Sequence, residues 1–352
     1  MITMNKQDKH IISIALELAK QGNPSPNPYV GAVLVKDGKI IGKGFHIRAG
    51  LPHAEIEAIN SVKDKSKIKG STLYVTLEPC SHYGLTPPCT DAILKYGIKK
   101  VICSVEDPTK KVKGIEILRK KGVQVETGLL EKEARELNEI FFHYSKTNLP
   151  FVAVKVAMSK DKKIGFIGKQ TKITGSVVDL FVHKLRSKYD AILVGINTIL
   201  IDNPELTSRV KKGKNPRRII LDPDLKTPIT AKVLQDANVT IVTTNLANKQ
   251  KKKLLEKKRV VVWTIGKNKI NLKKLLKKLG KFGITSLLVE GGAKTHKEFL
   301  KSKLINKFYL FISTRTLGNK NTIPLFDGLK PKLKIKEKKK LGKDTLIVAE
   351  PN

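Results

Sequence analysis

With 352 residues, 40% of them hydrophobic, the chain is too long for one hydrophobic core and has no apolar run that spans a bilayer, so two domains are expected. Three cysteines exclude a disulfide framework, and the polar N-terminus lacks a signal-peptide pattern, which predicts a cytoplasmic protein. The net charge of +38 attracts anions, but only nine of the 69 basic residues are Arg and the lysines are widely spread, which disfavours a specific nucleic-acid footprint.

In the first half of the chain, strands alternate with helices. Apolar residues at helical spacing predict a helix over 6–21, and Asp37-Gly38 predicts the tight turn of a β-hairpin. Strands are expected at 30–35, 39–44, 72–77, 100–105 and 123–126, and helices at 52–62, 89–96, 112–121 and 131–142. This alternation predicts an α/β sandwich with a parallel or mixed sheet.

A break at 148–150 separates the two halves, and we place the boundary near Thr147, giving domains at 1–147 and 148–352. In the second domain, strands are expected at 151–157, 191–194, 218–221, 239–243, 260–264, 286–290, 308–312 and 345–348, and helices at 176–188, 249–257 and 271–281. The pattern predicts a second α/β domain with a mixed sheet. Lysine-rich pieces such as 336–340 are interpreted as solvated helix faces.

The clearest chemical signal is His53-Ala54-Glu55 followed by Cys80 and Cys89. One imidazole and two thiols make a zinc site that lacks a fourth protein ligand, an arrangement typical of catalytic zinc. Glu55 is a carboxylate beside the open position, where it serves as a proton carrier. The alternative is a core histidine with its hydrogen bonds satisfied and two cysteines acting as buried apolar residues.

Local sequence predicts how these side chains are presented. Pro52 opens a helix, so His53 and Glu55 converge in its first turn, and the helix dipole helps to keep Glu55 ionised. Pro79 predicts an abrupt strand-to-helix corner that presents the thiolate of Cys80. Zinc nucleobase deaminases share the His-x-Glu and Pro-Cys pattern, but with two residues between the cysteines, whereas eight stand between them here.

The run Glu-Pro-Cys-Ser-His-Tyr-Gly-Leu-Thr-Pro-Pro-Cys at 78–89, with the segments 26–31 and 44–50, resembles the bifunctional riboflavin-biosynthesis deaminase/reductase. The resemblance implies a cytidine-deaminase-like α/β/α sandwich in the first domain. It implies that zinc is held by His53, Cys80 and Cys89, with Glu55 as the catalytic proton shuttle. The residues that would line the substrate pocket are Asn27, His46, Arg48, Ser81 and His82.

Three clusters in the second domain, at 155–161, 183–209 and 289–295, resemble the reductase domain of the same family. That domain has a dihydrofolate-reductase-like α/β fold with a mixed sheet and uses NADPH. A Gly-Gly turn lets backbone amides approach a pyrophosphate. Cofactor contacts implied by the resemblance are Ala157, Lys172, Thr198, Asp202, Gly291, Gly292, Ala293, Lys294 and Thr295. Substrate contacts implied in the same way are Gln170, Arg186, Leu206, Arg209 and Glu290, the two arginines meeting a phosphate.

The second domain departs from its family at two positions. Lys162 replaces a glycine, and Lys172 replaces a Trp of the cofactor wall. Lysine cannot stack as Trp does, but it can pair with a phosphate. For the reduction, the two candidate proton donors are Lys155 and Glu290.

The function predicted from the sequence is two successive steps of riboflavin synthesis. Zinc-dependent hydrolysis deaminates a diaminopyrimidinone phosphoribosylamino compound, and NADPH then reduces its ribosyl side chain to ribityl. One alternative is a zinc nucleoside or tRNA deaminase with a non-catalytic second domain, and another is a basic nucleic-acid-binding protein with structural zinc. The expected partner is a phosphorylated pyrimidine, without membrane or specific nucleic acid, and a homo-oligomer is left open.

Overall fold

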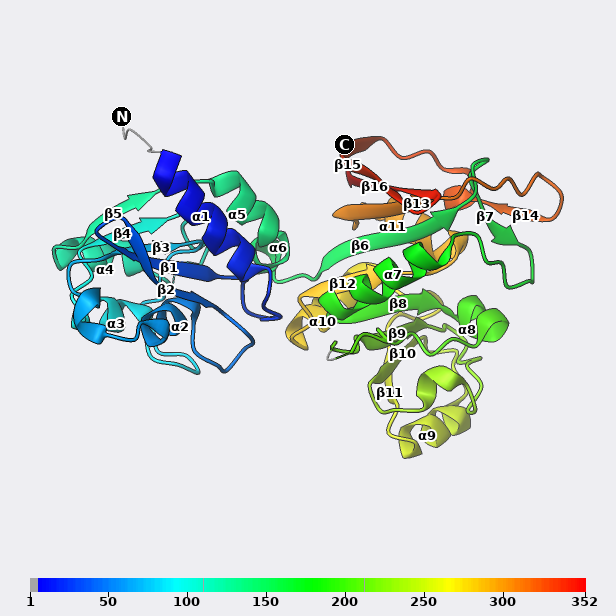
Figure 1. Cartoon of the computed structure of the whole chain (residues 1–352). Helices are drawn as coiled ribbons and strands as arrows, with labels where there is room; N and C mark the ends of the chain where they lie inside the picture. Colours follow the sequence, from blue (N-terminus) through cyan, green and yellow to red (C-terminus); the bar gives the residue numbers. More distant parts are fainter. Residues whose placement is uncertain (1–5, 110, 212) are drawn as a thin grey trace. The chain divides into compact units, whose positions relative to one another are not determined.

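The chain folds around one large β-sheet in each of two units, Met1–Asn148 and Leu149–Asn352 (Figure 1). The computed structural model describes residues 6–109, 111–211 and 213–352. Across these ranges, no helix combines the length and the apolar character needed to cross a membrane.

The first unit contains a five-stranded sheet in the order β2-β1-β3-β4-β5. Its strands are β1 (Gly31–Lys36), β2 (Lys39–Phe45), β3 (Thr72–Val75), β4 (Lys100–Cys103) and β5 (Gln124–Thr127). Its helices are α1 (Lys6–Ala19), α2 (Ala54–Ser61), the 3-10 helix η1 (Lys65–Ile68), α3 (Cys89–Lys95), α4 (Gly114–Lys120), α5 (Glu131–Leu137) and α6 (Glu139–Thr147).

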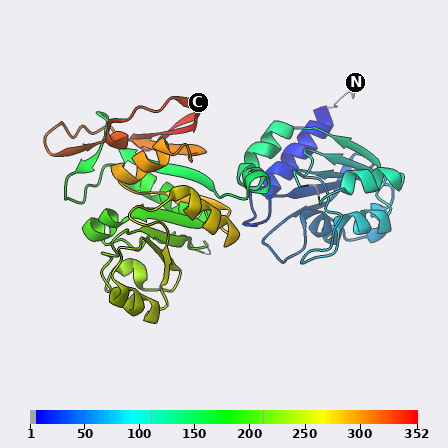
Figure 2. The same cartoon turned by 180° about the vertical axis from the view of Figure 1, so that it is seen from behind.

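Strand β1 runs antiparallel to β2 and β3, while β3, β4 and β5 are parallel, so the sheet is mixed. Helices α1, α5 and α6 cover one face, and α2 and α3 cover the other (Figures 1 and 2). The α/β/α sandwich predicted from the sequence is therefore confirmed.

Two glycines let α1 and α2 approach the sheet closely. A Cβ atom on Gly31 of β1 would lie 1.9 Å from the carbonyl oxygen of Ala15 in α1, and one on Gly44 of β2 would lie 2.2 Å from the backbone nitrogen of Ala58 in α2. A larger residue at either position would push a helix away from the sheet. Since α2 begins beside His53, this close packing fixes where the predicted zinc ligand lies.

The helix expected at 131–142 is instead two helices, α5 and α6, which meet at Asn138. This side chain is buried, and its Oδ1 accepts a hydrogen bond from the backbone nitrogen of Tyr29 at 2.7 Å. Its Nδ2 donates to the carbonyl oxygen of Tyr29 at 2.9 Å. The break therefore fastens the Pro/Asn-rich loop that carries Asn27, a long-range contact that helical periodicity does not reveal.

The second unit contains a nine-stranded sheet in the order β11-β10-β9-β8-β12-β6-β13-β16-β15 and a two-stranded sheet of β14 and β7. Its strands are β6 (Phe151–Met158), β7 (Lys163–Phe166), β8 (Ala191–Gly195), β9 (Arg217–Leu221), β10 (Val239–Thr243), β11 (Val261–Thr264), β12 (Ser286–Val289), β13 (Lys307–Ile312), β14 (Thr322–Pro324), β15 (Leu333–Leu341) and β16 (Asp344–Pro351). Its helices are α7 (Ser176–Lys188), α8 (Ile196–Asp202), η2 (Lys232–Leu234), α9 (Lys249–Lys257), α10 (Leu272–Lys281), α11 (Ala293–Lys301) and η3 (Leu325–Gly328).

Strands β8, β12 and β6 are adjacent and parallel in the middle of this sheet. Their side chains are almost completely buried, and the apolar core packs against both faces. Because carboxyl ends of parallel strands share one edge, the residues that follow these three strands lie close together. Strands β16 and β15 add an antiparallel edge, so the predicted mixed sheet is confirmed.

The interpretation of 336–340 as a solvated helix face is wrong. These lysines belong to β15, the edge strand, which pairs only with β16 in the described sheet. Most of its side chains are exposed, so it lacks the alternation of buried and exposed residues that identifies a strand. Lysine on an edge strand discourages pairing with other chains, which gives this composition a physical reason.

Candidate active sites

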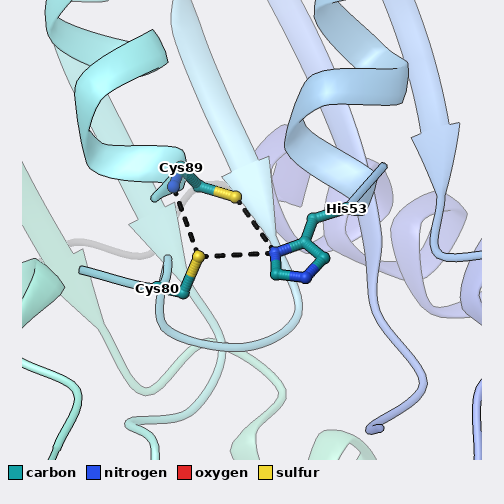
Figure 3. Close-up of side chains that lie close together, drawn as sticks. All are labelled: His53, Cys80 and Cys89. Atoms are coloured by element: carbon teal, nitrogen blue, oxygen red, sulfur yellow. Dashed lines mark hydrogen bonds between the residues drawn. The ribbon is translucent and has the colours of Figure 1, made fainter. Parts of the chain in front are cut away.

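The three predicted zinc ligands converge in the first unit (Figure 3). The Nδ1 atom of His53 lies 3.3 Å from Sγ of Cys80 and 3.4 Å from Sγ of Cys89. All three ligand atoms lie within 4.8 Å of one another. The backbone nitrogen of Cys89 also donates to Sγ of Cys80 at 3.3 Å.

This donor set fits zinc. Zinc bonds of about 2.3 Å to sulfur and about 2.1 Å to nitrogen, at a tetrahedral angle, place the two donors about 3.6 Å apart. The separations around His53 Nδ1 are close to that value. Three protein donors leave one position for water or substrate, as in catalytic rather than structural sites.

Each ligand lies at the end of a regular element or in the loop between two of them. His53 is the N-cap of α2, and Cys89 is the first residue of α3, preceded by Pro88. The strand-to-helix corner predicted at Pro79 is not found at Cys80. Cys80 lies in the irregular segment between β3 and α3, because eight residues separate it from Cys89, where the helix begins.

The thiols and the imidazole are electrostatically coupled. Hydrogen bonding from Cys89, with that from His53, lowers the pKa of the Cys80 thiol to about 4, although burial opposes the change. The hydrogen bond with Cys80 and burial raise the pKa of Cys89. The hydrogen bond with Cys80 also raises the pKa of His53. A cation at the centre of these donors would favour thiolates at both cysteines.

Glu55 is 3% exposed and lies in the first turn of α2. Burial raises its pKa to about 7, and the neighbouring Cys80 acts in the same direction. Desolvation of the buried carboxylate therefore opposes the ionisation of Glu55 that the helix dipole was expected to support. A carboxyl group with a pKa near neutrality can both accept and donate a proton at physiological pH.

Two of the ligands, His53 and Cys80, open onto a cavity of about 310 Å³ in the first unit, large enough for a pyrimidine ring. Glu55 lines it together with His53 and Cys80. Of the expected substrate contacts, Asn27, His46 and His82 line this cavity, whereas Arg48 and Ser81 are not among its lining residues. The Ser81 hydroxyl instead accepts a hydrogen bond from the backbone nitrogen of Lys113 at 2.8 Å.

His46 is buried, and both of its ring nitrogens have partners. Its Nδ1 lies 3.0 Å from the carbonyl oxygen of Pro52 and therefore donates to it, so Nε2 accepts from Nδ2 of Asn27, also at 3.0 Å. This arrangement leaves the amide oxygen of Asn27 as an acceptor on the cavity wall. Burial also lowers the pKa of His46, in agreement with a neutral ring.

Lys111 is the one Lys or Arg among the described residues that line this cavity. Sequence reasoning missed it, because a lysine inside a lysine-rich segment carries no distinguishing signal. It lies in the same wall as Asp107 and Thr109, whose hydroxyl donates to Asp107 at 2.5 Å. Among the described Lys and Arg residues of this wall, Lys111 is therefore the one that could pair with the phosphate of a bound ligand.

In the second unit, most predicted cofactor residues follow the adjacent strands β6, β8 and β12. Ala157 lies near the end of β6, Thr198 and Asp202 lie four residues apart on α8, and the Gly-Gly turn joins β12 to α11. A Cβ atom on Gly195, at the end of β8, would lie 2.6 Å from Oγ1 of Thr295. The β8–α8 corner and the start of α11 are therefore in close contact.

The start of α11 fits a phosphate group. Its N-cap, Gly292, provides no side-chain cap, so the first backbone amides stay available. A Cβ atom on Gly292 would meet nothing within 4 Å, whereas one on Gly291 would lie 2.6 Å from Cβ of Thr295. Open space on one side and tight packing on the other suit the pyrophosphate of a dinucleotide.

The two predicted substrate arginines differ in their surroundings. Arg186 donates from Nε and Nη2 to the carboxylate of Glu290, at 2.8 and 2.9 Å, and from Nη1 to the carbonyl of Thr207 at 3.2 Å. Arg209 is 60% exposed and pairs with Glu205 at 3.3 Å. The guanidinium of Arg209 is thus more accessible to an incoming phosphate than that of Arg186.

Three further predicted residues have different environments. Leu206 is buried with a φ of 58°, whereas Gln170 is exposed in the segment that joins β7 to α7. Lys172 is 70% exposed, and its Nζ lies 3.1 Å from Asp179. The substrate and cofactor roles of these residues stay predictions.

Two titratable groups beside this site are Lys155, one of the two predicted proton donors, and the buried His296, which was not predicted. Lys155, on β6, has its pKa lowered by burial, with a further decrease from Arg186, while Glu290 acts in the opposite direction. His296, on α11, is 1% exposed and stays neutral, because burial and the neighbouring Lys155 lower its pKa to about 3. A lysine between apolar strand residues was visible in the sequence, but the electrostatic influence of Glu290 on it was not.

Two family models match consecutive parts of the chain. The cytidine and deoxycytidylate deaminase zinc-binding region matches residues 5–105, and the RibD C-terminal domain matches residues 150–347. These matches include the zinc ligands in the first unit and the cluster around Arg186 and Glu290 in the second.

The chain is similar to curated proteins and solved structures over almost its full length. It is 44% identical to the riboflavin biosynthesis protein RibD of Aquifex aeolicus, over 97% of both chains. It is 34% identical to the RibD protein of Escherichia coli, over 97% of this chain and 98% of that one. The structure of Acinetobacter baumannii RibD superposes with a TM-score of 0.90 at 34% identity, covering 99% of each chain.

A Thermotoga maritima structure, described as a diaminohydroxyphosphoribosylaminopyrimidine deaminase/5-amino-6-(5-phosphoribosylamino)uracil reductase, superposes with a TM-score of 0.87. Its sequence is 37% identical, over 98% of this chain and 99% of that one. These full-length similarities favour an enzyme with two catalytic domains over a deaminase with a non-catalytic second domain. The chain belongs to the RibD family of riboflavin biosynthesis proteins.

Proposed function

We propose that this protein catalyses two successive steps of riboflavin synthesis, a zinc-dependent deamination and an NADPH-dependent reduction. The substrate is the phosphoribosylamino derivative of a diaminopyrimidinone. The observation that carries the deaminase is the position of buried Glu55 in the wall of the cavity that His53 and Cys80 also line. The reductase is supported by the RibD C-terminal domain match and by the cluster of polar groups after β6, β8 and β12.

In the deaminase, His53, Cys80 and Cys89 would hold the metal. Bound zinc lowers the pKa of a water molecule toward neutrality. Glu55 would take a proton from the attacking water and pass it to the leaving amine, so that a C–O bond forms, the C–N bond breaks and ammonia departs. A carboxyl pKa of about 7 suits both transfers, since the group is neither strongly acidic nor fully protonated at neutral pH.

The remaining wall of the cavity orients the substrate in this proposal. The amide oxygen of Asn27, held by His46, accepts a hydrogen bond from a ring N–H or amino group. The phosphate lies toward Lys111, the cation in the described part of the wall. This places the pyrimidine near Glu55 and the ribosyl phosphate toward the segment that follows β4.

In the reductase, the Gly291-Gly292 turn and the first turn of α11 bind the pyrophosphate, with Ala157, Thr198 and Asp202 as further contacts. Bound NADPH supplies a hydride to the sugar carbon. Arg209 meets the substrate phosphate, and the Arg186–Glu290 pair holds the neighbouring polar groups in place. In this proposal Gln170 and Leu206 contact the substrate and Lys172 contacts the cofactor, as the family resemblance implies.

Lys155 is the better of the two predicted proton donors. Arg186 holds the carboxylate of Glu290 ionised and lowers its pKa against the effect of burial, so this group has no proton to give. Burial lowers the pKa of Lys155, which makes its ammonium a stronger acid than an exposed lysine. We assign the transferred proton to Lys155.

The proposal includes a cytoplasmic location, because free thiols that serve as metal ligands persist in a reducing compartment. A homo-oligomer stays a prediction.

The function is tested with the purified chain, zinc, NADPH and the phosphoribosylamino substrate. Ammonia and NADPH oxidation are measured separately over the same time course. We expect ammonia release without NADPH, and NADPH oxidation only after deamination has supplied the uracil intermediate. Ammonia release without any NADPH oxidation, even with added intermediate, would contradict the reductase half of the proposal and leave only the deaminase.

A further inference from the structure

We propose that Thr86 is a positioning residue for the zinc ligand His53. The inference rests on the zinc site of the proposed function. The hydroxyl oxygen of Thr86 lies 3.3 Å from Nε2 of His53, on the side of the ring opposite the two thiols. In this role Thr86 accepts the Nε2–H and keeps the lone pair of Nδ1 directed toward the metal.

The assignment of the two ring nitrogens follows from the contacts. Both thiols approach Nδ1, at 3.3 and 3.4 Å, whereas the hydroxyl of Thr86 approaches Nε2. A neutral imidazole that binds metal through Nδ1 carries its proton on Nε2. The hydroxyl of Thr86 has free lone pairs, so it can accept that proton and fix both the tautomer and the rotation of the ring.

The other ring beside His53 cannot perform this task. His46 packs edge-to-face on His53 with centroids 5.1 Å apart. Its own nitrogens are engaged by the carbonyl of Pro52 and the amide of Asn27. Thr86 is thus the hydrogen-bond partner of His53 Nε2 within the described residues.

The contact between Thr86 and His53 offers a structural reason for the eight residues between the two cysteines. Thr86 belongs to the segment that begins at Cys80 and ends at Cys89, so one loop carries two ligands and the group that orients the third. A hydrogen bond from the backbone nitrogen of Gly84 to the carbonyl of Thr86, at 3.2 Å, narrows the loop near its tip. Only two residues between the cysteines would leave no room for such a group.

The test is the zinc affinity of the full-length chain, measured by competition with a chromophoric chelator. Thr86→Val keeps the size of the side chain but removes the acceptor, and it should weaken zinc binding about 10-fold to 100-fold, as expected when an outer partner of a metal ligand is lost. Thr86→Ser retains the hydroxyl and should restore most of the affinity. Thr109→Val is the matched control, since Thr109 lines the same cavity but bonds to Asp107.

Unchanged affinity in Thr86→Val would overturn the proposal, and so would equal weakening in Thr86→Val and Thr86→Ser. Nitrogen NMR of the wild-type zinc protein gives an independent answer if a variant fails to fold. We expect a proton on Nε2 of His53, and a proton on Nδ1 would overturn the assignment. Both readouts are independent of ammonia release, so failure of the proposed reaction would be recognised separately.

Discussion

Arg186 and Glu290 form a two-pronged ion pair beside the proposed reductase site, with N···O distances of 2.8 and 2.9 Å. The side chains are 15% and 6% exposed, so the pair is largely removed from water. Glu290 directly follows β12, whereas Arg186 lies near the end of α7, so the pair joins a sheet edge to a covering helix. The contact orders the site, and it also makes each partner depend on the other.

Arg186→Met should therefore destabilise the second unit strongly. It leaves the carboxylate of Glu290 buried without its partner, a change that typically costs about 3–5 kcal/mol. The double variant Arg186→Met with Glu290→Met should recover part of that loss, because no unpaired charge is left. Urea unfolding followed by the fluorescence of Trp263, the single Trp of the chain, measures both. A double variant less stable than Arg186→Met would contradict this account.

His296 should make the second unit less stable in acid. Its pKa in the folded protein is about 3, below the ordinary 6.5, because burial disfavours the charged ring. Below pH 6.5 the unfolded chain binds a proton that the folded chain does not, so stability falls by about 1.4 kcal/mol per pH unit until about pH 3. Urea unfolding of His296→Leu between pH 4 and 7 should lack this component, and equal slopes in the two proteins would refute it.

Lys111→Met should raise the KM of the deaminase about tenfold or more, since loss of a charged hydrogen bond costs about 1.5–3 kcal/mol. The kcat for ammonia release should change much less, because Lys111 binds a part of the substrate distant from the reacting carbon. The dephosphorylated substrate serves as the control, and the variant should not alter its KM. An equal rise in KM for both substrates would show that Lys111 does not bind the phosphate.

Arg209→Ala should chiefly raise the KM of the reductase for its phosphorylated substrate, by about tenfold on the same reasoning. Its exposed pairing with Glu205 contributes little to folding, so stability should hardly change. The KM for NADPH is the internal control and should stay the same. A variant that loses NADPH affinity instead would place Arg209 against the cofactor.

The sequence predicted most of the regular structure because periodicity and turn chemistry agreed. Asp37 and Gly38 both have positive φ in the hairpin, as an Asp-Gly turn requires. The second-domain helix at 249–257 has the predicted bounds. Elements that depend on distant partners were missed or wrong. The hydrogen bonds of Asn138 to Tyr29 divide a predicted helix into two. The exposed lysines of β15 concealed the alternating pattern by which a strand is predicted.

At the sites, residue types were predictable but environments were not. The spacing of His53, Glu55 and the two cysteines indicated their chemistry, whereas the pKa of Glu55 depends on its burial in the fold and on the nearby Cys80. The approach of Thr86 to His53 joins positions 33 residues apart, which no local pattern encodes. Arg186 was predicted to be available to a phosphate, but its pairing with Glu290 only became visible in the fold.

The most direct test of the account is Glu55→Gln in the full-length chain, with zinc content, ammonia release and reduction of the uracil intermediate measured on one preparation. Glutamine preserves the size of the side chain but cannot carry the proton. The account predicts retained zinc, ammonia release reduced by at least about 100-fold, and an unchanged rate of NADPH oxidation with the intermediate. Ammonia release at the wild-type rate by the zinc-loaded variant would contradict it.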